Sequence, residues 1–175
     1  LETALSDLAP GAISWINFQT LKYEKLLIKL TVDEMLESIN VNFISNFMAI
    51  KTLVPKMISS KRGSFIFIDS TRATIGDVGW GAYSSSKLAN VGLKKATVLE
   101  YGRFGVTCNT ISVSFVDTPM WQEIPEKKQS QFLAAVPGKK MVDFKEINST
   151  ISYLLENRIV NGLTVNLDGG LTNGY

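Results

Sequence analysis

Histidine is absent from this chain of 175 residues, and cysteine occurs once. Without histidine, a His-based catalytic triad and a histidine-ligated metal site are excluded, and we expect no metal centre. A single thiol cannot form a disulfide within the chain, so nothing points to an oxidising compartment. Because Cys108 stands in an apolar run, we predict a buried core thiol rather than a nucleophile.

The chain also lacks a long apolar stretch and a strong excess of one charge. No run is long enough to cross a bilayer, and the first residues lack the basic-then-apolar order of a signal peptide. The 18 Lys and Arg residues nearly balance 16 Asp and Glu residues, and the basic pairs are scattered. Nucleic-acid and membrane-surface binding need clustered positive charge. We therefore expect a cytoplasmic protein that binds neither partner.

Strand and helix patterns alternate along the whole chain, with no linker or repeat, which predicts one domain over residues 1–175. Short runs rich in β-branched and aromatic residues predict buried strands at 12–18, 64–69, 106–112 and 163–167. Periodic apolar residues predict helices at 31–57, 82–101 and 145–156, and a proline-containing, partly helical flap at 117–140. Buried strands separated by helices favour an α/β fold, a doubly wound parallel sheet with helices on both faces.

The first long helix has a clear start and an unusually broad apolar side. Thr31 and Glu34 form a capping-box pattern, which predicts the N-terminus of the helix. Apolar residues at three- and four-residue steps make a stripe wider than one core contact needs, so we expect this helix to pack on the sheet and on a partner. Pro55 is expected to kink or end its last turn.

The stretch "GAYSSSKLANVGLKK" carries the chemistry. Tyr83 and Lys87 stand four residues apart, so they project from the same face of the predicted helix. A phenol has a pKa near 10, and a neighbouring ammonium favours the phenolate and lowers that pKa. Ser70 ends a predicted buried strand thirteen residues earlier, at the sheet edge where active sites of parallel sheets gather.

With its other motifs, the sequence resembles the short-chain dehydrogenase/reductase family over almost its whole length. The matching positions are Ser70, the Tyr-x-x-x-Lys pair Tyr83 and Lys87, Asn42 within the long helix, Asn109, the segment Val116–Pro119 and the late "VNLDGG". Each motif is weak alone, but together they keep the family's order and spacing.

The resemblance implies a catalytic tetrad and a nicotinamide cofactor. Tyr83 would be the general acid or base, Lys87 would lower its pKa and bind the nicotinamide ribose, and Ser70 would bind the substrate carbonyl. Asn42 would hold, through its main chain, a water linked to Lys87. The family pattern places further cofactor contacts at Asn17, Val116 and Thr118, and it leaves NAD and NADP as alternatives.

The resemblance also implies a Rossmann-like sheet that is incomplete. The match begins at the family's fourth strand, so we expect strands four to seven of seven. No G-x-G-x-x-G turn follows any predicted strand; Gly76, Gly79 and Gly81 lie in a polar loop. We expect the chain to be part of a longer polypeptide, with a genuine half-length protein as the alternative.

Three departures from the family pattern keep a second function open. Gln19-Thr20 replaces an Ala-Gly pair, Val113-Ser114 replaces a Pro-Gly turn, and Asp69 places a carboxylate near the proposed oxyanion site. The first interpretation is a reductase or dehydrogenase. The second is a non-catalytic pseudo-enzyme or scaffold that keeps the fold.

Apolar residues suggest which class of substrate the protein binds and how its copies assemble. Met120 and Trp121, with Ile124 and Phe132, suggest an acyl, steroid-like or aromatic carbonyl substrate, or they merely anchor the flap to the core. The resemblance implies a homo-oligomer, a dimer or tetramer, formed through the two long helices.

Overall fold

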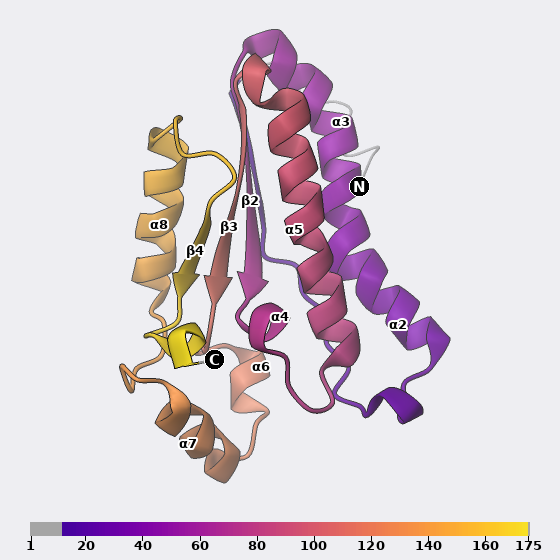
Figure 1. Ribbon diagram of the computed structural model, residues 1–175, viewed down its shortest axis with the longest axis vertical. Coiled ribbons are helices and arrows are strands. Elements are labelled where there is room, and N and C mark those ends of the chain that lie inside the picture. Colours follow the sequence, from indigo (N-terminus) through magenta and orange to yellow (C-terminus); the bar gives the residue numbers. More distant parts are fainter. Residues whose placement is uncertain (1–11, 175) are drawn as a thin grey trace.

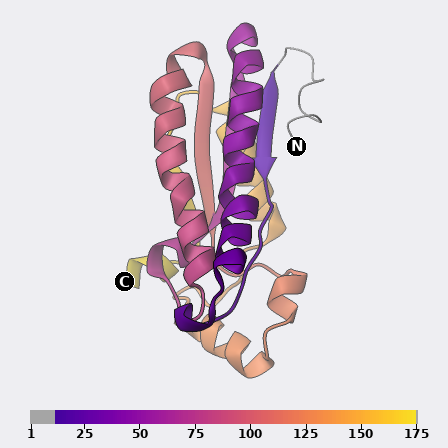
Figure 2. The same ribbon diagram turned by 90° about the vertical axis from the view of Figure 1, so that its right-hand side faces the viewer.

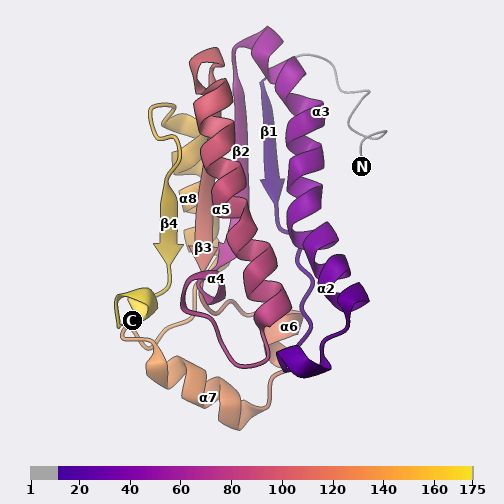
Figure 3. The same cartoon turned by 45° about the vertical axis from the view of Figure 1, so that its right-hand side comes forward.

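The computed structural model describes residues 12–174, and its strands form one fully parallel sheet in the order β1-β2-β3-β4. The strands are β1 (Ile13–Asn17), β2 (Gly63–Ser70), β3 (Val106–Val113) and β4 (Thr164–Leu167). Figure 3 shows them side by side with their arrowheads at the same end. The predicted strands are confirmed, and so is the parallel α/β architecture.

The pairing registers of the strands place β2 and β3 in the middle of the sheet, which explains why these two strands are buried. β2 pairs with β1 from Ile13↔Gly63 onward and with β3 from Gly63↔Val106 onward, so it has neighbours on both edges. β2 and β3 are buried along nearly their whole length, whereas β4 is half exposed. Parallel strands covered on both faces are usually rich in apolar residues, as the middle of β2 is, whereas β3 also buries the polar side chains of Thr107 and Asn109.

Helices and short turns connect the strands. In chain order they are η1 (Leu27–Lys29), α2 (Val32–Ile39), η2 (Asn40–Ile44), α3 (Ser45–Ser60), α4 (Arg72–Ile75), α5 (Gly81–Tyr101), η3 (Gly102–Phe104), α6 (Pro119–Gln122), α7 (Glu126–Ala135), α8 (Phe144–Glu156) and η4 (Leu171–Gly174). No helix within residues 12–174 is long and apolar enough to span a membrane.

The helices cover the sheet on both faces. α3 and α5 run side by side over one face, and α8 covers the other (Figures 1 and 2). The α3 and α5 face buries Leu53, Met57 and Phe65, and Cys108 lies in the same core with no exposed surface. The α8 face buries Ile111 and Ile147. The prediction of a core thiol is therefore confirmed, and burial raises the pKa of Cys108 to about 12.

The long helix begins as predicted but does not end at its proline. The capping box is present, with the Thr31 hydroxyl accepting from the Glu34 amide and the Glu34 carboxylate accepting from the Thr31 amide. Pro55 lies inside α3, which continues to Ser60, so of the two predicted effects, a kink or an end, the end is wrong. Leu53 and Met57 are anchored in the core on either side, and this packing holds the helix across the missing amide.

The same helix contains an irregularity that the sequence did not reveal. Between α2 and α3, η2 is a π-helical turn centred on Asn42. Such turns widen the helix and often occur at functional sites. The turn displaces backbone groups next to α5, the helix that carries Tyr83 and Lys87.

Candidate functional site

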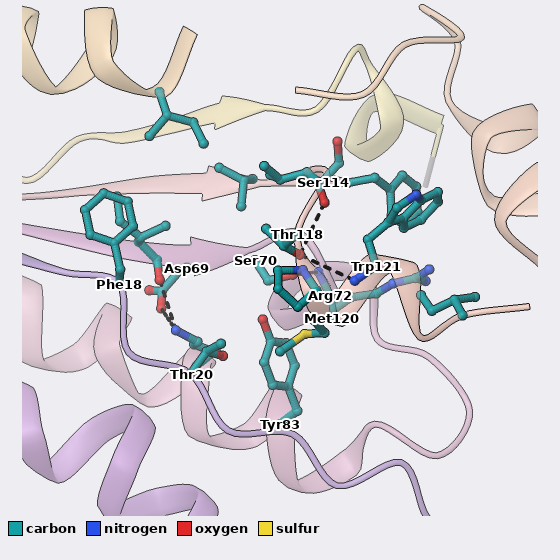
Figure 4. Close-up of a pocket in the computed structure, with 18 of the residues that line it drawn as sticks. Phe18, Thr20, Asp69, Ser70, Arg72, Tyr83, Ser114, Thr118, Met120 and Trp121 are labelled. Carbon is teal, nitrogen blue, oxygen red and sulfur yellow. Dashed lines mark hydrogen bonds and ion pairs between the residues drawn. The ribbon is translucent and has the colours of Figure 1, made fainter. Parts of the chain in front are cut away.

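A cavity of about 360 Å³ opens at the carboxyl ends of the strands, where α4, α6 and α7 gather. Of the predicted site residues, its walls include Ser70, Tyr83, Lys87, Val116, Thr118, Met120 and Trp121. Figure 4 shows Ser70, Tyr83, Thr118, Met120 and Trp121 around this cavity. Asn17 and Asn42 do not line it. The fold thus brings most of the predicted site together from three separate segments.

Local structure explains how these side chains meet. Ser70 is the last residue of β2, and Tyr83 lies in the first turn of α5. Val116 follows β3 and pairs with Val142 in an isolated parallel bridge. Thr118 is the N-cap of α6, where its hydroxyl accepts from the Trp121 amide. Residues far apart in the chain converge because parallel strands end at one edge.

Tyr83 is buried, with 7% of its surface exposed, and packs edge-on against Trp80 at 5.3 Å between ring centroids. Burial raises the pKa of its phenol; hydrogen bonds with Ser70 and Thr20 act in the opposite direction. The nearby Asp69 raises the pKa further. Burial therefore outweighs the lowering expected from a cation, and the charge that lowers the pKa of Tyr83 is that of Arg72 rather than that of Lys87.

The Lys87 ammonium lies against the end of β2. Its Nζ donates to the backbone oxygen of Ile68 at 3.0 Å and of Gln19 at 3.2 Å, and it stands 3.9 Å from Asp69 Oδ1. Burial lowers the pKa of Lys87, and the charge of Asp69 opposes that effect. Lys87 and Tyr83 share a helix face, but their polar ends have different partners.

Asp69 has two side-chain partners, both on α5. Asn90 Nδ2 donates to Asp69 Oδ1 at 3.0 Å, and Lys87 is its ion-pair partner. Successive residues of a strand point to opposite faces, which separates Asp69 from Ser70. The carboxylate is engaged by the helix, but it also lines the cavity and raises the pKa of Tyr83, so it lies near the proposed oxyanion site as expected. Burial raises the pKa of Asp69, against the opposing charge of Lys87.

Asn42 is held in a structural role by its side chain. Its Nδ2 donates to the Leu21 carbonyl at 2.8 Å, and its Oδ1 accepts from the Leu21 amide at 2.7 Å. The same Nδ2 reaches Ser86 Oγ at 2.9 Å. Its main-chain oxygen accepts from Asn90 Nδ2 at 3.1 Å.

The side chain of Asn17 also makes its hydrogen bonds within the protein. Nδ2 donates to Asn46 Oδ1 at 2.7 Å, and Oδ1 accepts from the Gln19 amide at 2.7 Å. These contacts shape the turn that carries Gln19 and Thr20. Any effect of Asn17 on a cofactor would therefore pass through that turn.

Two further residues, one lining the cavity and one in contact with its wall, were missed by sequence reasoning. The guanidinium of Arg72 lies 4.8 Å from the Phe132 ring centroid and 5.5 Å from that of Phe115, and it pairs with Asp77 at 2.7 Å. Asn90 reaches from α5 to Asp69. The signal for Asn90 was its position three residues after Lys87 on the same helix face. No sequence signal marked the aromatic surroundings of Arg72.

The wall beside Val116 fits the polar end of a nicotinamide. Ser114 Oγ is buried without a hydrogen-bond partner among the described residues, and Ser114 lines the cavity. An unpaired buried hydroxyl is costly unless a bound group completes it. Thr118 Oγ1 lies nearby, 3.4 Å from the Val116 carbonyl. These donors and acceptors suit a carboxamide.

Comparison with known proteins also identifies reductases and dehydrogenases. Residues 12–172 match the family model described as enoyl-(acyl carrier protein) reductase. The chain is 33% identical over 150 residues to 3-oxoacyl-(acyl-carrier-protein) reductase FabG of Buchnera aphidicola, covering 85% of this chain and 61% of that protein. It is 30% identical over 151 residues to (3R)-3-hydroxyacyl-CoA dehydrogenase of Mus musculus, covering 85% of this chain and 58% of that protein.

Solved structures share the fold. A candidate gluconate dehydrogenase of Agrobacterium tumefaciens superposes with a TM-score of 0.86 at 23% identity, covering 90% of this chain and 64% of that chain. ElxO, solved with NADP bound, gives a TM-score of 0.83 at 20% identity, covering 91% of this chain and 67% of that chain. The chain spans about three-fifths of the length of the curated relatives described above.

Proposed function

Because the chain belongs to the short-chain dehydrogenase/reductase family, we propose that it carries the catalytic part of an NAD- or NADP-dependent oxidoreductase acting on a carbonyl/alcohol pair. The observation that carries the proposal is the single cavity lined by Ser70, Tyr83, Lys87 and Thr118. A proton donor, a carbonyl-binding hydroxyl and a cation thus share one partly enclosed space.

Tyr83 is the proposed general acid. Its pKa is raised by burial, so the phenol stays protonated at neutral pH, which suits proton donation to a carbonyl oxygen during reduction. The Ser70 hydroxyl would donate to the same oxygen as negative charge develops. In the reverse direction the phenolate of Tyr83 would take the proton from the alcohol. A bound nicotinamide would supply or accept the hydride.

Lys87, Val116 and Thr118 are the proposed holders of the nicotinamide half. Lys87 would contact the ribose, while Thr118, with the unpaired Ser114 hydroxyl, would hold the carboxamide. Asn42 and Asn17 would act indirectly, by fixing Leu21 and the Gln19–Thr20 turn. We further propose that β1–β4 correspond to strands four to seven of the family sheet. Flanking sequence would then provide the phosphate site and decide between NAD and NADP.

The cavity favours an apolar substrate. Beyond the catalytic groups its walls are mostly apolar, with contributions from Val113, Phe115, Met120, Trp121, Ile124 and Phe132. Two relatives are named for acyl substrates, a 3-oxoacyl reductase and a 3-hydroxyacyl-CoA dehydrogenase. We propose an acyl compound with a reducible carbonyl, with Met120 and Trp121 in contact with its chain.

The helices also carry a proposed assembly surface. Leu36 on α2, Phe47 on α3 and Leu88 on α5 are each between 44% and 51% exposed although they are large and apolar. Apolar residues gathered on neighbouring helices suit burial against a second copy. A homodimer or homotetramer formed through these helices is therefore the proposed assembly.

The test is oxidation of NADPH and NADH by the purified full-length protein with a 3-oxoacyl thioester. Oxidation that depends on the thioester is expected. No oxidation and no binding of either reduced cofactor would instead support the second candidate, a non-catalytic scaffold. One observation favours that alternative: the Lys87 ammonium is engaged by Asp69 and backbone oxygens.

A further inference from the structure

Asp69 and Lys87 belong to a closed ring of buried polar contacts between β1, β2, α3 and α5. Starting from the turn after β1, the contacts are Asn17 Nδ2 to Asn46 Oδ1 (2.7 Å), Asn46 Nδ2 to Asn90 Oδ1 (3.1 Å), Asn90 Nδ2 to Asp69 Oδ1 (3.0 Å), Asp69 Oδ1 to Lys87 Nζ (3.9 Å), Lys87 Nζ to the Gln19 carbonyl (3.2 Å), and the Gln19 amide to Asn17 Oδ1 (2.7 Å). The five side chains are each at most 5% exposed. Such a network, shielded from water, constrains each of its members.

The direction of the hydrogen bonds shows that residue 69 acts as an acceptor. Asn46 donates to Asn90 Oδ1, so the Asn90 amide has its Nδ2 pointing at Asp69 and at the Asn42 carbonyl. Residue 69 therefore faces an N–H donor and an ammonium, and it must accept from both. An ionised carboxylate only accepts, whereas an amide also brings two donor hydrogens.

The charged groups around Asp69 single out Lys87 as its partner. Lys94, also on α5, acts on Asp69 from farther away and donates to Leu163 O and Thr164 Oγ1 on the β4 side. Tyr83 and Cys108 are neutral acids whose ionisation Asp69 disfavours. Within the described part of the chain, Lys87 is the cation within ion-pair distance of Asp69.

We propose that Asp69 is a positioning residue that keeps the Lys87 ammonium charged and fixed against the end of β2. The negative charge of Asp69 then offsets the effect of this ammonium on the ionisation of Tyr83. Buried ammonium groups tend to lose their proton unless a partner compensates for lost hydration. Asp69 supplies that compensation, and the asparagine ring holds Asp69 in place. The consequence for catalysis rests on the proposed function: Tyr83 stays protonated and the site favours reduction.

The test is an NMR titration of the lysine ammonium groups in full-length protein labelled with ¹³C and ¹⁵N at lysine. The Lys87 signal is assigned by its loss in Lys87→Met. In Asp69→Asn, we expect Lys87 to lose its proton about 1 to 3 pH units lower than in the wild type. In the matched control Asp77→Asn, which removes the carboxylate paired with Arg72, the Lys87 titration should not move. An unchanged Lys87 titration in Asp69→Asn would overturn the proposal.

A second measurement covers the case in which Asp69→Asn folds but is too unstable for the titration. If Asp69 acts through Lys87, the double variant Asp69→Asn/Lys87→Met should unfold at a higher temperature than Asp69→Asn alone, because no unpaired buried charge remains. A double variant that is destabilised by the sum of both single changes would refute the coupling.

These readouts separate the proposal from the proposed function. A shifted Lys87 titration in a protein that oxidises neither cofactor would retain the Asp69 role and reject the oxidoreductase. In an active protein, the alkaline decline of kcat/KM should begin at lower pH in Asp69→Asn, following Lys87. An active Asp69→Asn variant with an unmoved alkaline limb would reject the Asp69 role alone.

Discussion

Tyr83 and Lys87 show what spacing alone can and cannot predict about individual residues. Four-residue spacing correctly placed both on one helix face and in one cavity. It could not predict the hydrogen-bond partners of the ammonium, because Ile68, Asp69 and Gln19 approach from other segments. The predicted lowering of the Tyr83 pKa is outweighed by burial, which raises that pKa, and Asp69 adds to the rise.

Cys108 gives a prediction about the alkaline stability of the fold. Its pKa lies at about 12 in the folded protein against 9.0 for a free thiol, because burial disfavours the thiolate. Its contribution to stability is therefore complete below pH 9.0 and is lost as pH rises towards 12. At about 1.4 kcal/mol for each pKa unit, the full loss is on the order of 4 kcal/mol.

The measurement is urea denaturation between neutral and alkaline pH for the wild type and for Cys108→Ala. The variant should lose less stability over this range, although it starts lower because a core side chain is truncated. Folded wild type should also leave its thiol unreactive towards a thiol reagent at pH 8, whereas unfolded protein reacts. Rapid labelling of the folded protein would show that Cys108 is not buried.

At the scale of elements, local signals predicted the starts and types of helices and strands. The capping box at Thr31 and the apolar runs of β2 and β3 depend on neighbouring residues only. The continuation of α3 through Pro55 and the π-helical turn at Asn42 depend on distant contacts. The two hydrogen bonds between the Asn42 side chain and the Leu21 backbone join residues 21 positions apart, so no local sequence pattern predicts them.

Pro55→Ala tests how α3 tolerates its proline. The residue is exposed and lies in the helix interior, where proline removes one backbone hydrogen bond and crowds the preceding turn. Alanine should raise the free energy of unfolding by about 1 to 3 kcal/mol, partly offset by the greater freedom of the unfolded chain. Urea denaturation measures this change. A variant less stable than the wild type would mean that the backbone geometry set by Pro55 is required for packing.

At the scale of the whole molecule, the order of patterned segments was enough to predict a parallel sheet covered on both faces. Figure 1 shows the result, with α3 and α5 on one side of the strands and α8 on the other. The convergence of the cavity residues also followed from this topology, since parallel strands end together. The polar ring at Asp69 did not follow, because it needs the relative position of four elements.

Leu88→Glu tests the proposed assembly. Leu88 is 51% exposed on α5, and α5 packs against α2, the helix that carries the equally exposed Leu36. A charge there should break a helix-mediated dimer or tetramer, because burying an unpaired carboxylate costs several kcal/mol. Light scattering after size-exclusion chromatography should show a lower mass than the wild type. The matched change Leu99→Glu, at a more exposed position farther along α5, maps how far the interface extends. An unchanged mass for Leu88→Glu would place any interface elsewhere.

The most direct test of the account is the rate of cofactor oxidation in Tyr83→Phe, with the full-length protein and a 3-oxoacyl thioester. Removing one hydroxyl should lower kcat/KM by about 100- to 10,000-fold, because the general acid is lost, while the melting temperature changes little. Tyr153→Phe, an exposed change on α8, should keep wild-type activity. Wild-type activity in Tyr83→Phe would contradict the central claim that this phenol delivers the proton.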